Sequence, residues 1–186
     1  MKITAILLLL ALCPAAFAGP ESRTLKGVSM PEIMAFEGKN LELNGMGLRT
    51  KVVFKVYVAG LYLENKSSDG QAIAVSRQLK RMELVFLRAV DGADVAAAIT
   101  DGFNKNSGSL LPSFKDRMEA FSKMIPDVKK GDKLVFVYRP DAALEISANG
   151  KISGLIEGKD FSDVLFKVWL GEKPADKALK AGLLGL

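Results

Sequence analysis

The sequence predicts an α+β fold in which a layer of α-helices covers an antiparallel β-sheet. Strand-like segments come first along the chain, followed by two helix-like segments, a run of three short strands and two more helices. The helix-like segments carry apolar residues about four positions apart, whereas the strand-like segments alternate at every second position. Blocks of strands and helices in this order are typical of a single domain with helices packed on a sheet.

The first half of the chain supplies most of the predicted sheet. Residues 23–35 have a short, mixed pattern that Pro31 interrupts, so we expect one or two edge strands there. Residues 43–64 combine glycines with β-branched and aromatic residues, which favours a central strand segment. The dipeptide Asn44-Gly45 at its start is a strong hairpin signal and predicts a turn at that point.

A short helix and a buried strand are expected next. Residues 71–77 predict a helix with Ile73 and Ala74 facing inward. Residues 81–88 predict a strand with large apolar side chains on both faces. Such a strand is covered on both sides of the sheet.

Two helices in series follow this strand. The first is expected over residues 91–105, with Asp91 or Asp94 as its N-terminal cap. The second is expected to start at Pro112 and to end near residue 125. Their inward-facing residues recur about every four positions and are Val95, Ile99 and Phe103 in the first helix and Phe114, Met118, Phe121 and Ile125 in the second.

The next part of the chain predicts a three-strand meander and a helix. Alternating apolar residues mark strands between residues 133 and 156, and Asn149-Gly150 predicts the last turn. Asp160 is the expected cap of the following helix, and Gly171 the residue that ends it.

Two further features lie near the C-terminus. A last short helix is expected after Asp176, with Leu179 and Leu183 facing inward. Trp169 lies in the apolar stripe of the preceding helix, so we expect it in the core rather than in a ligand cage.

The N-terminus has the pattern of a cleavable export signal. Lys2 precedes an apolar run of about ten residues, too short to span a bilayer, and small residues lead up to Gly19. We therefore expect a signal peptide over residues 1–18 and one domain over 19–186, in the periplasm or secreted. Lipidation of Cys13 is a less favoured alternative, because Leu12 is a poor neighbour for it. No stable membrane insertion is expected after cleavage.

Composition excludes several kinds of chemistry. The chain has no histidine, and its only cysteine would leave with the signal peptide. These losses remove the usual zinc and copper ligands and the usual nucleophile and base pairs, so we expect no metal, no cofactor and no hydrolase chemistry. The mature charge would be 25 − 21, or +4, without a dense basic run. A nucleic-acid surface is therefore not predicted.

Arg49 is the charged residue that most needs explanation. It stands among apolar residues in the segment predicted to be a strand. A buried guanidinium without a partner is costly, so an anionic or strongly accepting group should face it. That group is either part of the protein, such as a carboxylate or carbonyl, or a ligand, unless the side chain reaches solvent at the strand end.

Four stretches of the sequence resemble one family. They are Gly-Met-Gly-Leu-Arg at 45–49, Lys-Val-Tyr-Val-Ala-Gly-Leu-Tyr-Leu-Glu at 55–64, Gly-Lys-Asp-Phe at 158–161 and Phe-Lys-Val-Trp-Leu-Gly at 166–171. The chain resembles the exported bacterial members of the chalcone isomerase-like family over nearly its whole mature length. The resemblance implies an open-faced sandwich, a sheet with helices on one side.

The resemblance also implies a ligand site. The family contains isomerases, which cyclise chalcones, and non-catalytic proteins in which an Arg and a Tyr hold the carboxylate of a fatty acid. Arg49 matches the Arg shared by both branches, and Tyr57 matches the Tyr of the fatty-acid-binding branch, where the isomerases have Thr. The isomerases also use a Tyr on the helix that corresponds to residues 91–106, which has none here. We therefore expect ligand-binding residues Arg49 and Tyr57, and no catalytic residue.

Arg49 and Tyr57 can form a clamp for a carboxylate only if the chain reverses between them. In an unbroken strand, eight residues at about 3.3 Å each would separate them by roughly 26 Å. A bend near residues 50–53 is therefore required. The alkyl tail of the ligand would lie between sheet and helices, and its candidate lining residues are Phe54, Phe86, Ile99 and Phe103.

Two alternatives stay open at the level of the sequence. One is an isomerase or lyase acting on a small enone, with Arg49 as electrophile and Tyr57 as proton donor. The other is an envelope protein that binds another protein, with Arg49 in a purely structural role. The leading hypothesis is a periplasmic, non-catalytic binding protein for a fatty acid or a similar amphipathic carboxylate.

Overall fold

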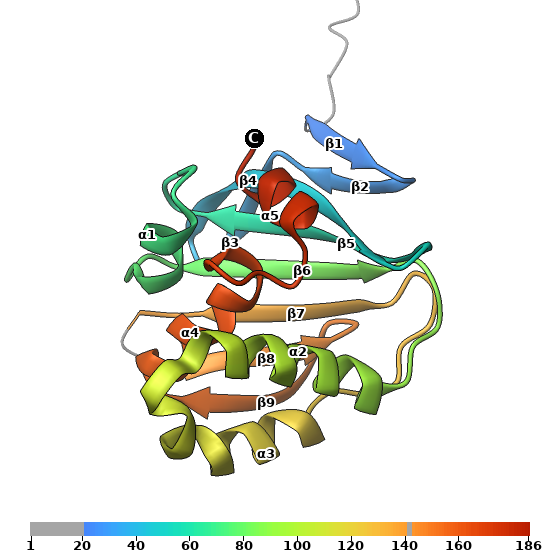
Figure 1. Cartoon of the computed structure of the whole chain (residues 1–186). Coiled ribbons are helices and arrows are strands. Elements are labelled where there is room, and N and C mark those ends of the chain that lie inside the picture. Colours follow the sequence, from blue (N-terminus) through green and yellow to red (C-terminus); the bar gives the residue numbers. More distant parts are fainter. Residues whose placement is uncertain (1–20, 141–142) are drawn as a thin grey trace, which may run out of the picture.

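A computed structural model of the chain describes residues 21–140 and 143–186, so the expected signal peptide lies outside the described residues. The main feature is a seven-stranded antiparallel sheet whose strands follow each other in chain order from β3 to β9 (Figure 1). A separate two-stranded sheet precedes it. The strands are β1 (Ser22–Leu25), β2 (Val28–Pro31), β3 (Ile33–Phe36), β4 (Lys39–Lys51), β5 (Phe54–Leu63), β6 (Lys80–Phe86), β7 (Lys133–Tyr138), β8 (Ala143–Ala148) and β9 (Lys151–Glu157).

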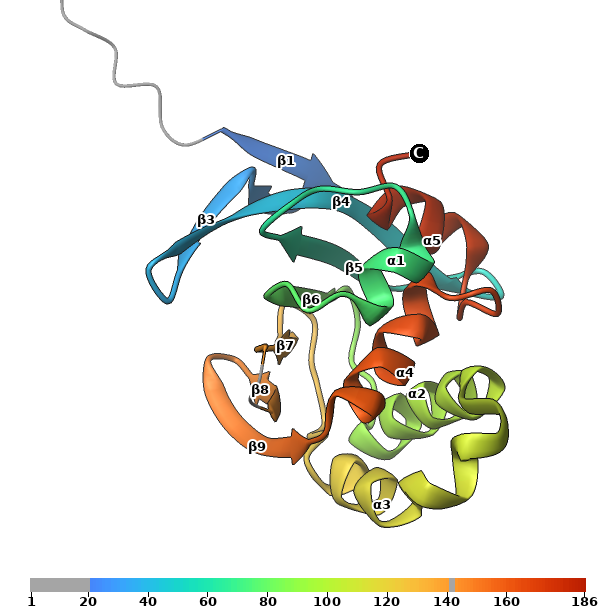
Figure 2. The same ribbon diagram turned by 90° about the vertical axis from the view of Figure 1, so that its left-hand side faces the viewer.

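The helices cover one face of this sheet, which confirms the predicted α+β class. Figure 2 shows α1, α2, α4 and α5 on the same side of the strands. The helical segments are α1 (Gly70–Val75), α2 (Gly92–Ser107), a 3₁₀ helix over Gly108–Phe114, α3 (Lys115–Lys123), α4 (Lys159–Leu170) and α5 (Lys177–Leu183).

Both faces of the sheet carry buried apolar side chains. The larger cluster lies between sheet and helices, where Phe103, Phe136 and Trp169 are almost completely buried. A smaller cluster on the other face includes Tyr62 and Met30 of β2, so the β1–β2 hairpin covers part of that face. The two clusters explain why β6 is apolar on both of its faces, as its sequence predicted.

The predicted turn at Asn44-Gly45 is wrong. Both residues lie inside β4, at an irregularity in its pairing with β5. The buried Asn44 amide donates to the Ser67 and Leu183 carbonyls at 3.0 and 2.8 Å, and it accepts from the Ser67 N–H. Asn44 is thus held by tertiary contacts, and the chain reverses instead at Val52-Val53.

Three helix starts differ in detail from their prediction. Asp91 is the N-cap residue of α2, as predicted, but its side chain makes no capping bond, and the Gly92 N–H donates instead to Asp127 at 2.8 Å. Asp160 lies in the first turn of α4, whose cap is Gly158, and its carboxylate pairs with Arg117 at 2.8 Å. Likewise, α3 begins at Lys115, after a 3₁₀ helix that contains the predicted start. At the starts of α2 and α4, a residue distant in sequence supplies the contact, Asp127 in the first case and Arg117 in the second.

Other local predictions are confirmed. Asp176 caps α5 through the N–H groups of Ala178 and Leu179. Asn149 and Gly150 both have positive φ in the β8–β9 turn, which is the conformation that this dipeptide favours. The inward-facing residues expected in α1, α2 and α5 are buried, as are those expected in the segment from residue 114 to 125.

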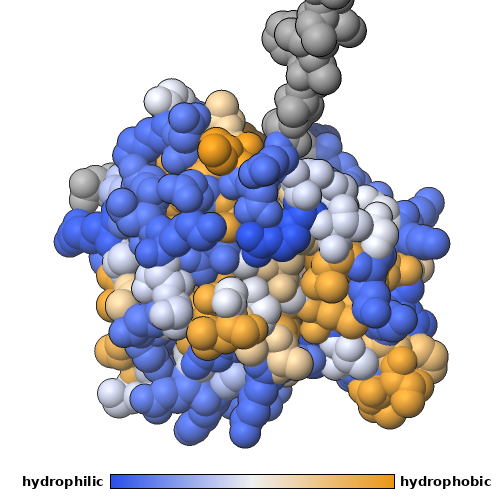
Figure 3. Space-filling view, turned by 90° about the horizontal axis from the view of Figure 1, so that it is seen from above, coloured by the Kyte–Doolittle hydropathy of each residue, from blue (hydrophilic) through white to orange (hydrophobic). Residues whose placement is uncertain are grey.

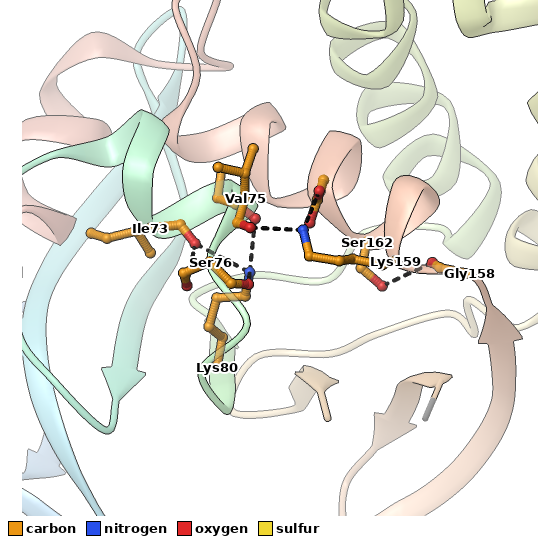
Figure 4. Close-up of polar contacts among 9 residues, drawn as sticks. Ile73, Val75, Ser76, Lys80, Gly158, Lys159 and Ser162 are labelled. Atoms are coloured by element: carbon orange, nitrogen blue, oxygen red, sulfur yellow. Dashed lines mark hydrogen bonds and ion pairs between the residues drawn. The ribbon is translucent and has the colours of Figure 1, made fainter. Parts of the chain in front are cut away.

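A fully buried lysine stabilises the end of α1. The Lys80 ammonium donates to the carbonyls of Ile73, Ala74 and Ser76 at 3.1, 2.7 and 3.0 Å (Figure 4). These carbonyls lie at the C-terminal end of α1, where helix carbonyls lack their usual N–H partners, and that of Ile73 also accepts from Ser76. Lys159 donates to the remaining carbonyl nearby, that of Val75.

We expect Lys80 to make the protein more stable as the pH rises from about 7 to about 10. Burial lowers the pKa of Lys80 from 10.5 to about 7, against the opposing effect of Asp163. Within this window the folded state holds fewer protons than the unfolded state, so the free energy of unfolding increases with pH. Urea unfolding at a series of pH values should show this increase in the wild type and not in Lys80→Met.

The upper limit of this window is set by two tyrosines. Burial raises the pKa of both Tyr57 and Tyr62 above the ordinary value of 10, so they lower the stability at higher pH. Equal pH dependence of the wild type and Lys80→Met below pH 10 would contradict the assignment to Lys80.

Candidate ligand-binding site

A cavity of about 520 Å³ opens between the β4–β5–β6 end of the sheet and helices α2 and α4. Its volume is within the range of small-molecule sites, which is about 300–1,000 Å³. Its wall is mainly apolar, formed among others by Val56, Leu84, Phe86, Val95, Ile99 and Val168. The polar groups in the wall include Arg49, Tyr57 and Trp169. This combination suits a ligand with an apolar body and a polar head.

The β4–β5 hairpin brings Arg49 and Tyr57 together. Its turn at Val52-Val53 makes Arg49 and Tyr57 direct cross-strand partners. Such partners have Cα atoms about 4.5–5.5 Å apart and side chains on the same face of the sheet. The reversal that a shared carboxylate requires is therefore present, at the position where the sequence demanded it.

Arg49 is partly buried and is paired with Asp176, the cap of α5. Its Nη1 donates to Asp176 Oδ2 at 3.3 Å and to the Thr50 carbonyl at 2.6 Å. The side chains of Arg49 and Asp176 are 23% and 15% exposed. Nε and Nη2 of Arg49 make no hydrogen bond to the residues that the structure describes. The guanidinium therefore keeps one edge with N–H donors for a ligand.

Asp176 is held in its charged form. Burial alone would raise its pKa, but the N–H groups of Leu179, Thr50 and Ala178 and the charge of Arg49 outweigh it and lower the pKa. The Asp176 carboxylate already has four partners, the three N–H groups and Nη1 of Arg49, so it does not need a second nitrogen of the guanidinium. It orients Arg49 without saturating it.

The Tyr57 hydroxyl is oriented by Trp169. The indole Nε1 of Trp169 donates to the Tyr57 oxygen at 3.0 Å, while the ring of Tyr57 packs edge-on against Phe86. Burial raises the pKa of Tyr57 to about 12, although this hydrogen bond and Arg49 act in the opposite direction. Tyr57 is therefore a neutral phenol that accepts from Trp169 and keeps its O–H as a donor for a ligand.

Most, but not all, of the predicted site residues surround this cavity. Arg49, Tyr57 and three of the expected lining residues, Phe54, Phe86 and Ile99, lie in its wall. Phe103 does not line it: one turn further along α2, it packs at 5.1 and 4.9 Å from the rings of Phe114 and Phe161 in the core. The helix carries its apolar stripe past the end of the cavity, so periodicity could not separate the two environments.

Sequence reasoning missed two members of the site. Trp169 is buried as predicted, but its polar N–H faces Tyr57 rather than the core. Asp176 was recognised only as a helix cap, which is its local role. The need for a partner for Arg49 was a signal for such a carboxylate, but 127 residues separate the two, so only the fold identifies which one.

We expect Tyr57 and Trp169 to stabilise the protein jointly. A double-mutant cycle with Tyr57→Phe, Trp169→Phe and the combined variant should give a coupling of about 1 kcal/mol, the usual net value of one hydrogen bond. Chemical unfolding measures it. Coupling near zero, with additive losses, would show that the indole and phenol do not interact.

Other kinds of site are not found in the part of the chain that the structure covers. Residues 21–140 and 143–186 contain no group of three or more acidic, cysteine or histidine side chains arranged to hold a metal ion. Within the same ranges, none of the helices has both the length and the apolar character needed to cross a bilayer.

The fold and the cavity define the class of protein. The structure resembles that of a fatty-acid binding protein of Arabidopsis thaliana with a TM-score of 0.72, over 88% of this chain and 96% of that chain. At 16% sequence identity this likeness establishes the fold, the chalcone isomerase-like arrangement of a curled antiparallel sheet and helices.

The amino-acid sequence identifies the family. The profile of the family described as chalcone isomerase-like matches residues 22–185, so the chain belongs to the chalcone isomerase-like family. No sequence among curated proteins matches this chain significantly.

Proposed function

We propose that this protein is a non-catalytic binding protein for a fatty acid or a similar amphipathic carboxylate. The observation that carries the proposal is the mainly apolar cavity with Arg49 and Tyr57 side by side in its wall. The similar Arabidopsis structure is that of a fatty-acid binding protein, which supports the binding branch of the family over the catalytic one.

The two polar groups suit a carboxylate head. The free edge of Arg49 offers charged N–H donors, and Tyr57 adds a neutral O–H donor. The ligand carboxylate would share Arg49 with Asp176, since a guanidinium has five N–H donors. No general base is needed for this role.

The tail of the ligand would lie against the apolar wall. Each buried methylene contributes about 0.8 kcal/mol, so affinity should rise with chain length until the cavity is filled. Phe86 and Ile99 are buried in this wall, whereas Phe54 lies at its exposed rim.

The proposal is tested by identifying the bound ligand and by measuring fatty-acid binding. Protein purified without added lipid should carry a fatty acid or a related acid, which mass spectrometry of an organic extract would identify. Delipidated protein should then bind saturated fatty acids of increasing length with increasing affinity in calorimetric titration. An empty protein that also binds no added acid would contradict the proposal.

A separate assay with a chalcone addresses an isomerase function. A proton donor is most effective when its pKa is near the working pH, and burial has raised the pKa of Tyr57 to about 12. We therefore expect no turnover of a chalcone. Turnover that disappears in Tyr57→Phe would replace the binding function by a catalytic one.

We further propose that the protein works in the periplasm after removal of residues 1–18. The basis is the charged, apolar and small-residue pattern at the start of the sequence. The mass of the protein recovered from the periplasmic fraction should correspond to a chain that begins at Gly19. A full-length protein in the cytoplasmic fraction would contradict this.

A further inference from the structure

The turn between β4 and β5 presents three apolar side chains in succession to solvent. Val52, Val53 and Phe54 are 88%, 76% and 58% exposed. Figure 3 shows apolar side chains gathered on a projection at the lower right, toward the end of the molecule where Figure 1 places this turn. Single exposed apolar residues are ordinary, but a contiguous apolar projection indicates contact with an apolar partner.

The conformation of this turn is costly for its sequence. Val52 has a φ of 58°. This region suits glycine or asparagine and is a true outlier for a β-branched residue. Neither packing nor the local backbone accounts for a valine there, since Val52 is the most exposed of the large apolar residues that the structure describes.

The tip is surrounded by positive charge. Lys51 and Lys55 flank it in sequence, and the Arg88 guanidinium lies 4.8 Å from the ring centre of Phe54. None of these three cations forms an ion pair with the residues covered by the structure. Two carboxylates, Asp91 and Asp94, lie in the cavity wall, so the excess of positive charge belongs to the hairpin rather than to the whole cavity.

We propose that the β4–β5 hairpin docks the protein on an anionic lipid surface. The apolar tip would enter the interface while Lys51, Lys55 and Arg88 contact lipid phosphates, which is how peripheral proteins combine apolar burial with electrostatic attraction. A lipid surface fits better than a protein partner. Specific protein interfaces bury more than about 1,000 Å², whereas three side chains are enough for reversible contact with a bilayer.

The position of the hairpin gives docking a further consequence. Val52 and Phe54 of the tip, together with the flanking Lys51, also line the cavity. A docked hairpin would therefore place one wall of the cavity at the bilayer, where amphipathic acids are dissolved. This consequence rests on the proposed function, whereas docking itself does not.

The test uses vesicles and ligand-free protein. Full mature chain should float with vesicles of phosphatidylcholine and phosphatidylglycerol, but not with phosphatidylcholine alone, and high salt should release it. Val53→Asp should weaken binding about tenfold or more, because a charged group replaces an apolar one at the interface. Lys55→Glu should weaken it at least about fivefold, the contribution of one cation near an anionic surface.

Matched controls separate docking from folding and from ligand binding. Ile33→Asp changes a side chain that is 60% exposed on the β3 edge, and Lys66→Glu changes an exposed lysine in the loop after β5, at the other end of this strand. Both controls should float like the wild type. Neither Val53 nor Lys55 lines the cavity, so fatty-acid affinity measured without vesicles should be unchanged in their variants.

Three results would overturn the proposal. They are no flotation of the wild type, equal flotation of the tip and control variants, and self-association through the tip that Val53→Asp abolishes while vesicles are not bound. A wild-type protein that binds fatty acids but does not float with vesicles would contradict this inference alone. A wild-type protein that floats with vesicles but binds no fatty acid would contradict only the proposed function.

Discussion

Replacing Arg49 with methionine is expected to weaken the binding of a long-chain fatty acid about 10- to 100-fold, the effect of losing charged hydrogen bonds worth about 1.5–3 kcal/mol. The apolar wall is unchanged in this variant, so the tail should still bind. Calorimetric titration with the fatty acid and its methyl ester separates the two contributions. The wild type should prefer the acid, and Arg49→Met should bind acid and ester alike.

Arg117→Met is the matched control for this variant. Arg117 also forms an ion pair with an aspartate, Asp160, at 2.8 Å, but it lies outside the cavity. Both variants should lose little stability, because partly exposed ion pairs contribute about 0–1 kcal/mol. Only Arg49→Met should lose the preference for the acid. An unchanged preference in that variant would show that the head group binds elsewhere.

Substituting alanine for Gly45 is expected to destabilise the protein by about 3 kcal/mol, at the upper end of the usual cost of overpacking. A Cβ at this position would lie 2.2 Å from the Gly182 carbonyl oxygen and 2.6 Å from that of Leu183. Both atoms are backbone, so α5 would have to move away from β4. Thermal unfolding should show a decrease in Tm of about 6–12 °C for a domain of this size.

Gly150→Ala is the control that distinguishes the effect of a steric clash from the effect of a positive φ. Gly150 has a φ of 80° and no atom within 4 Å of a Cβ, whereas Gly45 does not have a positive φ. The control should therefore cost only about 1 kcal/mol, from strain in the left-handed region. Because α5 begins beside Asp176, Gly45→Ala should also weaken fatty-acid binding, and Gly150→Ala should not. Equal Tm values for the two variants would contradict a tight β4–α5 contact.

The strands and helices could be predicted where a local pattern and the tertiary structure agree. The alternation of Leu144 and Ile146 in β8 and the stripe of Val95, Ile99 and Phe103 in α2 predicted which residues would be buried, whereas Ile152 and Leu155 of β9 are exposed. Asn44-Gly45 is the opposite case. Its turn propensity is real, but two hydrogen bonds that Asn44 donates to the Ser67 and Leu183 carbonyls and one that it accepts from the Ser67 N–H hold it within a strand. Local preference is worth about 1 kcal/mol and yields to such contacts.

The candidate site could also be predicted only in part, because some of its residues are marked by a local motif and others are not. Arg49 and Tyr57 could be identified from the motif that surrounds them, and the requirement for a reversal between them followed from strand geometry. The reversal itself falls at Val52-Val53, which has no sequence signal for a turn, since valine disfavours positive φ. The partners Asp176 and Trp169 come from the C-terminal part of the chain, and no local pattern links them to the hairpin.

The sequence alone determined the class of fold, the faces of its elements and the two residues proposed to hold a ligand. Burial patterns and motifs depend on residues that are close together in the sequence. Only the tertiary structure decided that Asn44-Gly45 stays within a strand, which carboxylate orients Arg49 and which group orients Tyr57. These depend on contacts across more than a hundred residues, such as Arg49 with Asp176 and Tyr57 with Trp169. Such contacts form only when β4, β5, α4 and α5 pack together, and their energy is a property of that packing.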